Sequence, residues 1–109
     1  GKSHDTFGPI GPYLVTKDEI KEVNNLNMSL DVNGKRMQTG NTETMIFNVD
    51  QIVSYVSRFM SLQPGDIITT GTPPGVGMGM KPQQFLKAGD EMRLKIDSLG
   101  EQKSKVVSI

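Results

Sequence analysis

The chain has 109 residues, of which 35% are hydrophobic, and its twelve basic and twelve acidic side chains cancel to zero net charge. This length bounds the chain to one domain with a modest core. The balanced charge argues against nucleic-acid binding, which needs a clustered basic surface. No apolar stretch is long enough to span a membrane. The absence of cysteine excludes disulfides and cysteine–zinc sites, and it fits a cytoplasmic location.

The N-terminal segment is rich in polar chemistry, because residues 1–6 read Gly-Lys-Ser-His-Asp-Thr without an initiator methionine. We therefore expect the sequence to be part of a longer polypeptide. Two Gly-Pro pairs follow within residues 8–12, and each proline pushes the residue before it toward extended geometry. This pattern predicts an ordered loop that leads into a short strand at residues 13–16.

A β-hairpin is the clearest local prediction. Residues 26–32 alternate apolar and polar side chains with a period of two, which is typical of a half-buried strand. Asn33-Gly34 follows at once, and this pair favours a type I′ turn because both central residues need positive φ. We predict the return strand at residues 35–39.

The period changes to that of a helix in residues 48–60, where the apolar side chains fall on one helical face. Asn48 is placed to cap the start, and Gln51 stands at the capping-box position three residues later. The helix is expected to end near Leu62, before Pro64, because proline cannot continue it.

Three further strands are predicted, at residues 67–70, 91–97 and 103–108. The total is five to seven short strands and one helix. Such a pattern indicates a mainly β domain, a sandwich or an open barrel, with the helix covering one edge or face.

Residues 69–79, TTGTPPGVGMG, raise the question of a nucleotide site. The glycine spacing does not match the dinucleotide fingerprint, and no helix is predicted after it. Gly1-Lys2-Ser3 resembles the end of a phosphate-binding loop but lacks both the preceding residues and the following helix. A nucleotide-binding domain is therefore disfavoured, and a loop at a strand's exit is expected.

The single histidine and the acidic residues give weak signals. His4 and Asp5 are adjacent, and neighbouring side chains on an extended segment point in opposite directions, so a loop histidine is favoured over a catalytic dyad. The carboxylates form no Glu-x-Glu, Asp-x-Asp-x-Asp or His-x-His set. The sequence alone therefore offers no convincing metal site.

A site for a small keto acid needs a cation near the forming enolate, together with hydroxyl or backbone donors for a carboxylate. Lys2 is a candidate for the cation. Thr70, Gly71 and Thr72 lie at the exit of a predicted strand and could supply the donors. Sequence spacing leaves open whether these groups meet.

Three segments together resemble the fumarylacetoacetate hydrolase family, in the C-terminal half of its catalytic domain. They are GKSHDTF with GPIGP at residues 1–12, VNG with QTGNT and MIF at residues 32–47, and PGD leading to TGTPPGVG at residues 64–77. The resemblance covers essentially the whole chain. Residues 81–90 and 99–101 look most like bacterial members described as ureidoglycolate lyases or 2,4-diketo-3-deoxy-fuconate hydrolases.

This resemblance implies a mainly β, mixed sandwich roll with one helix, present here only as its C-terminal part over residues 1–109, and often a homodimer. It also implies Mg²⁺ or Mn²⁺ and a small 2-keto or 2,4-diketo acid, which is cleaved, decarboxylated or isomerised through an enolate-like intermediate. Lys2 would be the active-site lysine and Thr6 would lie beside it. Thr72, with Thr70 and Gly71, would hold the substrate carboxylate or keto oxygen.

The chain departs from the family in two respects. The family usually has an aromatic residue where His4 stands, so no role is transferred to His4. The family's metal ligands, a Glu-x-Glu pair and an Asp, lie upstream of the lysine.

An alternative is that the chain is a non-catalytic β module that serves binding or dimer formation on the same scaffold.

We predict that the isolated chain has no hydrolase activity and no tight Mg²⁺ or Mn²⁺ site, because the resemblance puts the ligands outside it. Calorimetric titration with either ion should give no binding isotherm. One-to-one binding with micromolar affinity would contradict this prediction.

Overall fold

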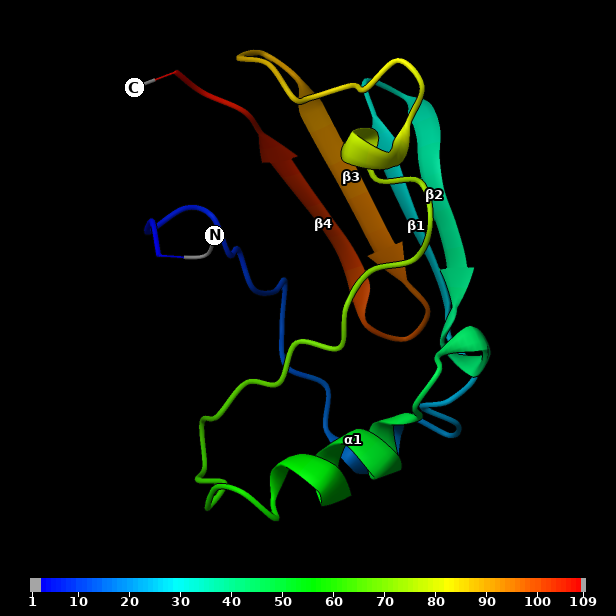
Figure 1. Cartoon of the computed structure of the whole chain (residues 1–109), viewed down its shortest axis with the longest axis vertical. Helices are drawn as coiled ribbons and strands as arrows, with labels where there is room; N and C mark the ends of the chain where they lie inside the picture. Colours follow the sequence, from blue (N-terminus) through cyan, green and yellow to red (C-terminus); the bar gives the residue numbers. More distant parts are fainter. Residues whose placement is uncertain (1–2, 109) are drawn as a thin grey trace.

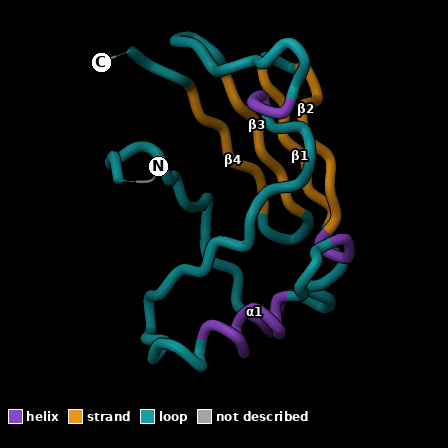
Figure 2. The backbone as a smooth tube through the Cα atoms, in the orientation of Figure 1, coloured by secondary structure: helices purple, strands orange, loops and turns teal. Residues whose placement is uncertain are grey.

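The computed structural model describes residues 3–108, and within them four strands form one antiparallel sheet in the order β2-β1-β3-β4 (Figure 1). The strands are β1 (Asn27–Val32), β2 (Lys35–Asn41), β3 (Glu91–Ile96) and β4 (Gly100–Lys105). The helix α1 spans Val49–Val56, and three 3-10 turns are η1 (Lys17–Glu19), η2 (Thr42–Thr44) and η3 (Gly77–Gly79). Long loops join the rest (Figure 2). The mainly β class with one helix is confirmed.

The predicted turn and helix cap are both confirmed. Asn33 and Gly34 have φ of 50° and 78°, the two positive values that a type I′ turn needs. Asn48 and Gln51 form the capping box, each side chain accepting a hydrogen bond from the other residue's backbone N–H. The regular helix ends at Val56, earlier than predicted, and the backbone N–H groups of Arg58 and Phe59 donate to the carbonyls three residues before them. No helix in the described residues is long and apolar enough to cross a membrane.

Three predicted strands need correction. Residues 13–16 and 67–70 form no strand, and the described part of the chain has four strands rather than five to seven. An extended segment becomes a strand only when a neighbour accepts its hydrogen bonds, and neither segment joins the sheet. The last strand lies at Gly100–Lys105 rather than 103–108, although Val106 still exchanges backbone hydrogen bonds with residues 89–90.

A β-bulge interrupts the hairpin. Leu30 pairs with Gln38 while Asp31 pairs with Arg36, so Met37 is an extra residue on β2. One inserted residue reverses the inward and outward alternation of the strand beyond it. Gln38 consequently shares a sheet face with Leu30.

The two sheet faces differ sharply in polarity. One face carries Met28, Leu30 and Val32 of β1 with their partners Ile96, Leu94 and Met92 of β3. The other face carries surface ion pairs, including Arg93–Glu101 at 2.7 Å, which lowers the pKa of the Glu101 carboxyl. Exposed pairs of this kind stabilise little. Contacts on the apolar face therefore contribute more to the stability of the sheet than these ion pairs do.

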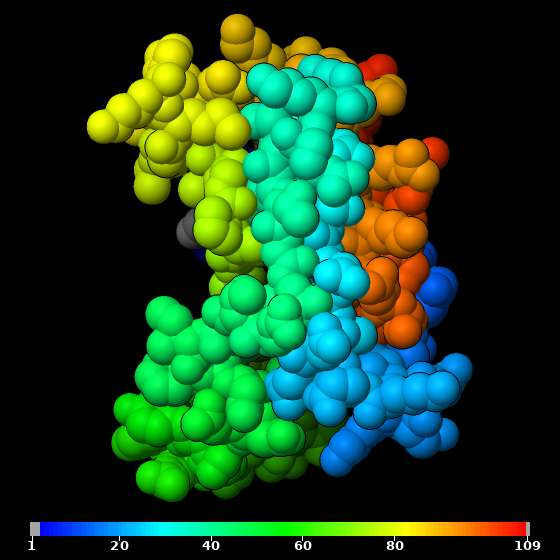
Figure 3. Space-filling model, turned by 90° about the vertical axis from the view of Figure 1, so that its right-hand side faces the viewer, coloured from blue at the N-terminus to red at the C-terminus, as the bar shows by residue number. Residues whose placement is uncertain are grey.

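The connection from β2 to β3 has to travel the length of the sheet, because both strands run antiparallel to β1. Residues 42–90 pass through α1 and return along the apolar face beside β2 (Figures 1 and 3). The return is close. A Cβ added at Gly40 would lie 2.7 Å from Pro73 Cβ, and one at Gly75 would lie 2.0 Å from the Met37 oxygen.

Two Asn–Asp pairs fasten the ends of β1 to the ends of β3. Asn27 donates from its side chain to Asp97 at 2.9 Å, and Asn33 donates to Asp90 at 2.8 Å. The Asn33 hydrogen bond, together with the backbone N–H of Lys87, lowers the pKa of the Asp90 carboxyl. These pairs fix the register of two strands that are far apart in the sequence.

The core of the described residues is thin. Only Leu26 and Gln38 are buried among them, and the surface area is 9060 Å². A compact monomer of 11.9 kDa would expose about 6,000 Å². The radius of gyration, 15.4 Å, also exceeds the roughly 13 Å expected for a compact domain of this length. A large apolar surface is therefore uncovered.

The close approach of the returning loop gives a stability prediction. Gly75→Ala should destabilise more than Gly65→Ala, because both glycines have positive φ, 109° and 97°, but only Gly75 faces nearby backbone. We expect about 1–2 kcal/mol for Gly65→Ala from the φ alone and about 1–3 kcal/mol more for Gly75→Ala from crowding. Urea denaturation measures both, and equal losses would show that the loop does not press on β2.

Candidate active-site loop

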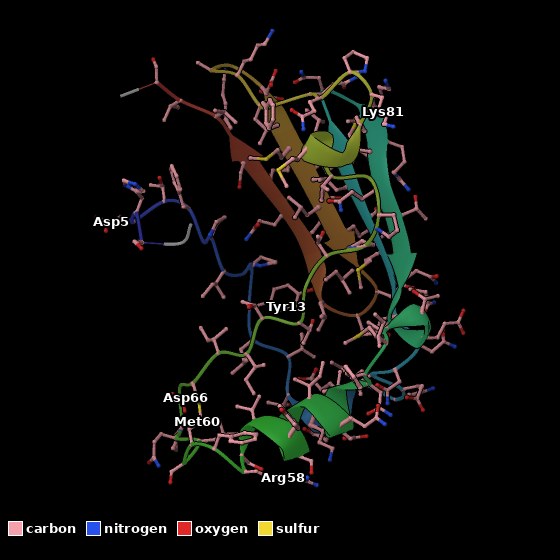
Figure 4. The ribbon with its side chains drawn as sticks, in the orientation of Figure 1. Asp5, Tyr13, Arg58, Met60, Asp66 and Lys81 are labelled. Carbon is pink, nitrogen blue, oxygen red and sulfur yellow. The ribbon has the colours of Figure 1, made fainter. Side chains whose placement is uncertain are left out.

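Two loops bracket the apolar face of the sheet at its opposite edges. Cross-strand partners place four residues in one row on this face: Gly40, Met28, Ile96 and Gly100. At the β2 edge, Pro73 occupies the space that a Gly40 side chain would need. At the β4 edge, a Cβ on Gly100 would lie 2.6 Å from the Tyr13 hydroxyl oxygen (Tyr13 is labelled in Figure 4). Glycine at each edge thus lets a loop approach the sheet closely.

The next row across the sheet holds each loop by a hydrogen bond. This row is Gln38, Leu30, Leu94 and Gln102. Gln38 donates to the Thr72 hydroxyl at 2.8 Å and to the Pro73 carbonyl at 2.6 Å. Gln102 donates to the Gly11 carbonyl at 3.4 Å. A glutamine at each edge therefore binds a loop, and Leu30 and Leu94 lie between the two glutamines in the same row.

The segment 69–79 is a strap across the sheet rather than a phosphate cradle. Gly71 and Gly75 bend it with φ of 97° and 109°. The Gly77 carbonyl accepts a hydrogen bond from the Gln84 backbone N–H at 3.0 Å, and a Cβ added at Gly77 would lie 1.8 Å from the Gln84 oxygen. The 3-10 turn η3 is too short to act as the helix that a dinucleotide loop requires.

Three of the predicted site residues lie together and are exposed: Thr70, Gly71 and Thr72. Within the described residues, no group accepts a hydrogen bond from their backbone N–H groups. Pro73, which follows them, has no N–H of its own. The start of the strap therefore presents three backbone donors that are free among residues 3–108, together with one oriented hydroxyl.

The other predicted residues lie on the N-terminal side. Lys2 falls outside the described residues. Thr6 is exposed on the loop that Asp5 marks in Figure 4. This loop leads to residues 11–13, which lie against the β4 edge of the sheet. In the described part of the chain no hydrogen bond joins Thr6 to Thr72.

His4 and the carboxylates form no metal site in the described residues. The His4 ring contacts the Phe7 ring with centroids 4.6 Å apart, and the Phe7 N–H donates to the His4 carbonyl. In residues 3–108, no three histidine, aspartate or glutamate side chains lie close enough together to hold a metal ion. Asp90 is engaged by Asn33 and Lys87.

A hollow of about 770 Å³ lies between the apolar face and residues 83–87. Its lining includes Leu30, Val32 and Met92 of the sheet and Phe85 opposite them. None of the exposed donors of the strap lines it. The hollow is therefore separate from the donors of the strap.

Gln38 is the residue of this site that sequence reasoning gave no role. Regular alternation from the Asn33-Gly34 turn would pair Gln38 with Ser29 on the polar face. The bulge at Met37 moves Gln38 onto the apolar face instead. A bulge has no dependable sequence signal, so the pattern alone could not have found Gln38.

Comparison with known proteins agrees with this arrangement. The family model "Fumarylacetoacetate (FAA) hydrolase C-terminal" matches residues 1–107. The chain belongs to the fumarylacetoacetate hydrolase family, in its C-terminal region, as the sequence motifs indicated.

Among curated relatives, the 2,4-didehydro-3-deoxy-L-rhamnonate hydrolase of Sphingomonas sp. (strain SKA58) is 62% identical over 107 residues, which are 97% of this chain and 38% of that protein. The solved fumarylacetoacetate hydrolase of Exiguobacterium antarcticum is 41% identical with a TM-score of 0.96, covering 100% of this chain and 39% of that one. Maleylpyruvate hydrolase of Sphingobium sp. SYK-6, solved with manganese(II) and pyruvate, is 39% identical with a TM-score of 0.87 over 95% of this chain and 37% of that one. The chain therefore spans under two fifths of these relatives.

Proposed function

We propose that residues 1–109 are the C-terminal portion of a single catalytic domain whose whole acts on a small 2-keto or 2,4-diketo acid. The observation that carries this proposal is the set of free donors at Thr70, Gly71 and Thr72, held on a strap across the sheet. The excess surface area supports the domain assignment, because a further covering layer would bury the apolar face. The names of the relatives support the substrate class.

In this proposal the strap binds the substrate's carboxylate or keto oxygen. Backbone N–H groups and a hydroxyl are neutral donors, and donors fixed in advance stabilise a developing negative charge without reorganising. The Lys2 ammonium supplies the positive charge near the enolate-like intermediate, and Thr6 lies beside the substrate. Proton transfer and C–C bond cleavage need groups beyond these donors.

A divalent metal does not fit the described residues, since they bring no three suitable ligands together. The manganese complex of the maleylpyruvate hydrolase supports divalent-metal use in the family. We propose Mg²⁺ or Mn²⁺ for the whole enzyme, with ligands contributed outside residues 1–109. A homodimer and a cytoplasmic location also stay predictions.

The site assignment predicts losses of activity in the full-length polypeptide that contains this chain. Thr72→Val should lower kcat/KM for the best acid in a panel of 2-keto and 2,4-diketo acids roughly 10- to 100-fold, and Lys2→Ala roughly 100- to 1,000-fold. Thr69→Val is the matched control, because Thr69 is an exposed neighbour with no assigned role. Unchanged turnover in Thr72→Val and Lys2→Ala would remove both residues from the site. Absence of turnover with every acid would favour the non-catalytic module.

The domain assignment predicts a difference between the isolated chain and the full-length polypeptide. The exposed apolar side chains, such as Leu14 at 92% and Ile46 at 91%, should make the isolated chain self-associate or bind a hydrophobic dye. The full-length polypeptide should bind much less dye per mole. A monomeric, dye-silent chain that unfolds in one sharp transition would contradict this assignment.

A further inference from the structure

Gln38 is the one polar side chain that is buried in the described residues, with 8% of its surface exposed. Its side-chain nitrogen lies 2.8 Å from the Thr72 hydroxyl oxygen and 2.6 Å from the Pro73 carbonyl oxygen. A buried amide that donates both of its N–H groups to one loop is well placed to fix the conformation of that loop.

The direction of these hydrogen bonds follows from the chemistry of the partners. A carbonyl oxygen can only accept, so the contact with Pro73 fixes the NH₂ end of the Gln38 amide toward the strap. The opposite amide orientation would bring two acceptor oxygens within 2.6 Å of each other. The same NH₂ group reaches Thr72, so the Thr72 oxygen accepts there.

A hydroxyl that accepts from Gln38 still has its own proton to donate. Among the described residues, no group accepts that proton. Thr72 is exposed whereas Gln38 is buried beneath it. A ligand on the strap would thus meet Thr72 and would not touch Gln38.

Gln38 is itself held firmly. It lies on the edge strand β2, directly after the bulge residue Met37, and it pairs with Leu30 of the inner strand β1. Gly75 packs so closely that a Cβ on it would lie 3.1 Å from the Gln38 side chain. The amide is therefore confined between the sheet and the strap.

We propose that Gln38 is a positioning residue: it holds the Thr72 hydroxyl as a donor toward the bound carboxylate or keto oxygen. This inference rests on the proposed function of Thr72. Its consequence is that the role of Gln38 exists only through the Thr72 hydroxyl.

A double-mutant cycle in the full-length polypeptide tests this dependence. Gln38→Met keeps the length and removes both donors, and we expect it to raise KM roughly 10-fold with a smaller change in kcat. Gln38→Glu should raise KM further, on the order of 100-fold, because its carboxylate would accept the proton that Thr72 needs for the ligand. In a Thr72→Val background, Gln38→Met should raise KM by less than about 2-fold.

Gln102→Met is the matched control. Gln102 stands at the other edge of the same row and holds Gly11 rather than Thr72. Any change in KM caused by Gln102→Met should be the same in the wild-type and the Thr72→Val backgrounds. Thermal unfolding of each variant verifies folding, and Gln38→Glu, nearly the same shape as the native side chain, carries the cycle if Gln38→Met does not fold.

The outcomes separate the two proposals. If Thr72→Val leaves KM and kcat unchanged, the proposed role of Thr72 fails, and the positioning role fails with it. Thr72→Val can impair binding while Gln38→Met raises KM by the same factor in the wild-type and the Thr72→Val backgrounds. In that case Thr72 keeps its role and the inference about Gln38 is overturned. Coupling between Gln38 and Thr72, with none between Gln102 and Thr72, supports the inference.

Discussion

The pairing of β1 with β3 is the interaction on which the rest of the structure depends. β1 already has β2 as a neighbour through the hairpin, and β3 becomes its second neighbour from the far end of the sequence. Closing such a long loop loses conformational entropy before the contacts between the strands can offset that loss. The Asn27–Asp97 and Asn33–Asp90 pairs fasten both ends of this pairing, so the register cannot slip. β4 then adds as a simple hairpin on β3.

The site is a geometric consequence of that pairing. Residues 42–90 leave from the end of β2 and must reach the opposite end of the sheet, where β3 begins. They do so over the apolar face, which is why Gly40 and Gly75 have no room for side chains. A segment held this close to a strand is stiff although it has no regular secondary structure. The same crossing brings Thr72 within reach of Gln38.

Local chemistry was predictable from the sequence, and long-range partnership was not. The Asn33-Gly34 turn and the Asn48–Gln51 capping box depend only on neighbouring residues, so their patterns identified them correctly. Residues 13–16 and 67–70 have extended character but no neighbouring strand, and nothing local reveals a missing neighbour. The family resemblance singled out residues 70–77 as site residues, but their path along β2 was not predicted. Gln38 was hidden because a bulge, set by tertiary packing, reversed its side.

Under the proposed function, the exposure of the strap predicts that a covering layer strengthens its binding of an anion. Donors in open water exchange one hydrogen bond for another, so binding an anion there gains little. Excluding water lowers the effective dielectric and strengthens the same contacts several-fold. The apolar face beside the strap has large side chains exposed, including Leu94 at 36%. Under the proposed domain assignment, the layer that covers this face also excludes water from Thr70–Thr72. Under that assignment, one covering layer both buries the apolar face and strengthens the hydrogen bonds of the donors.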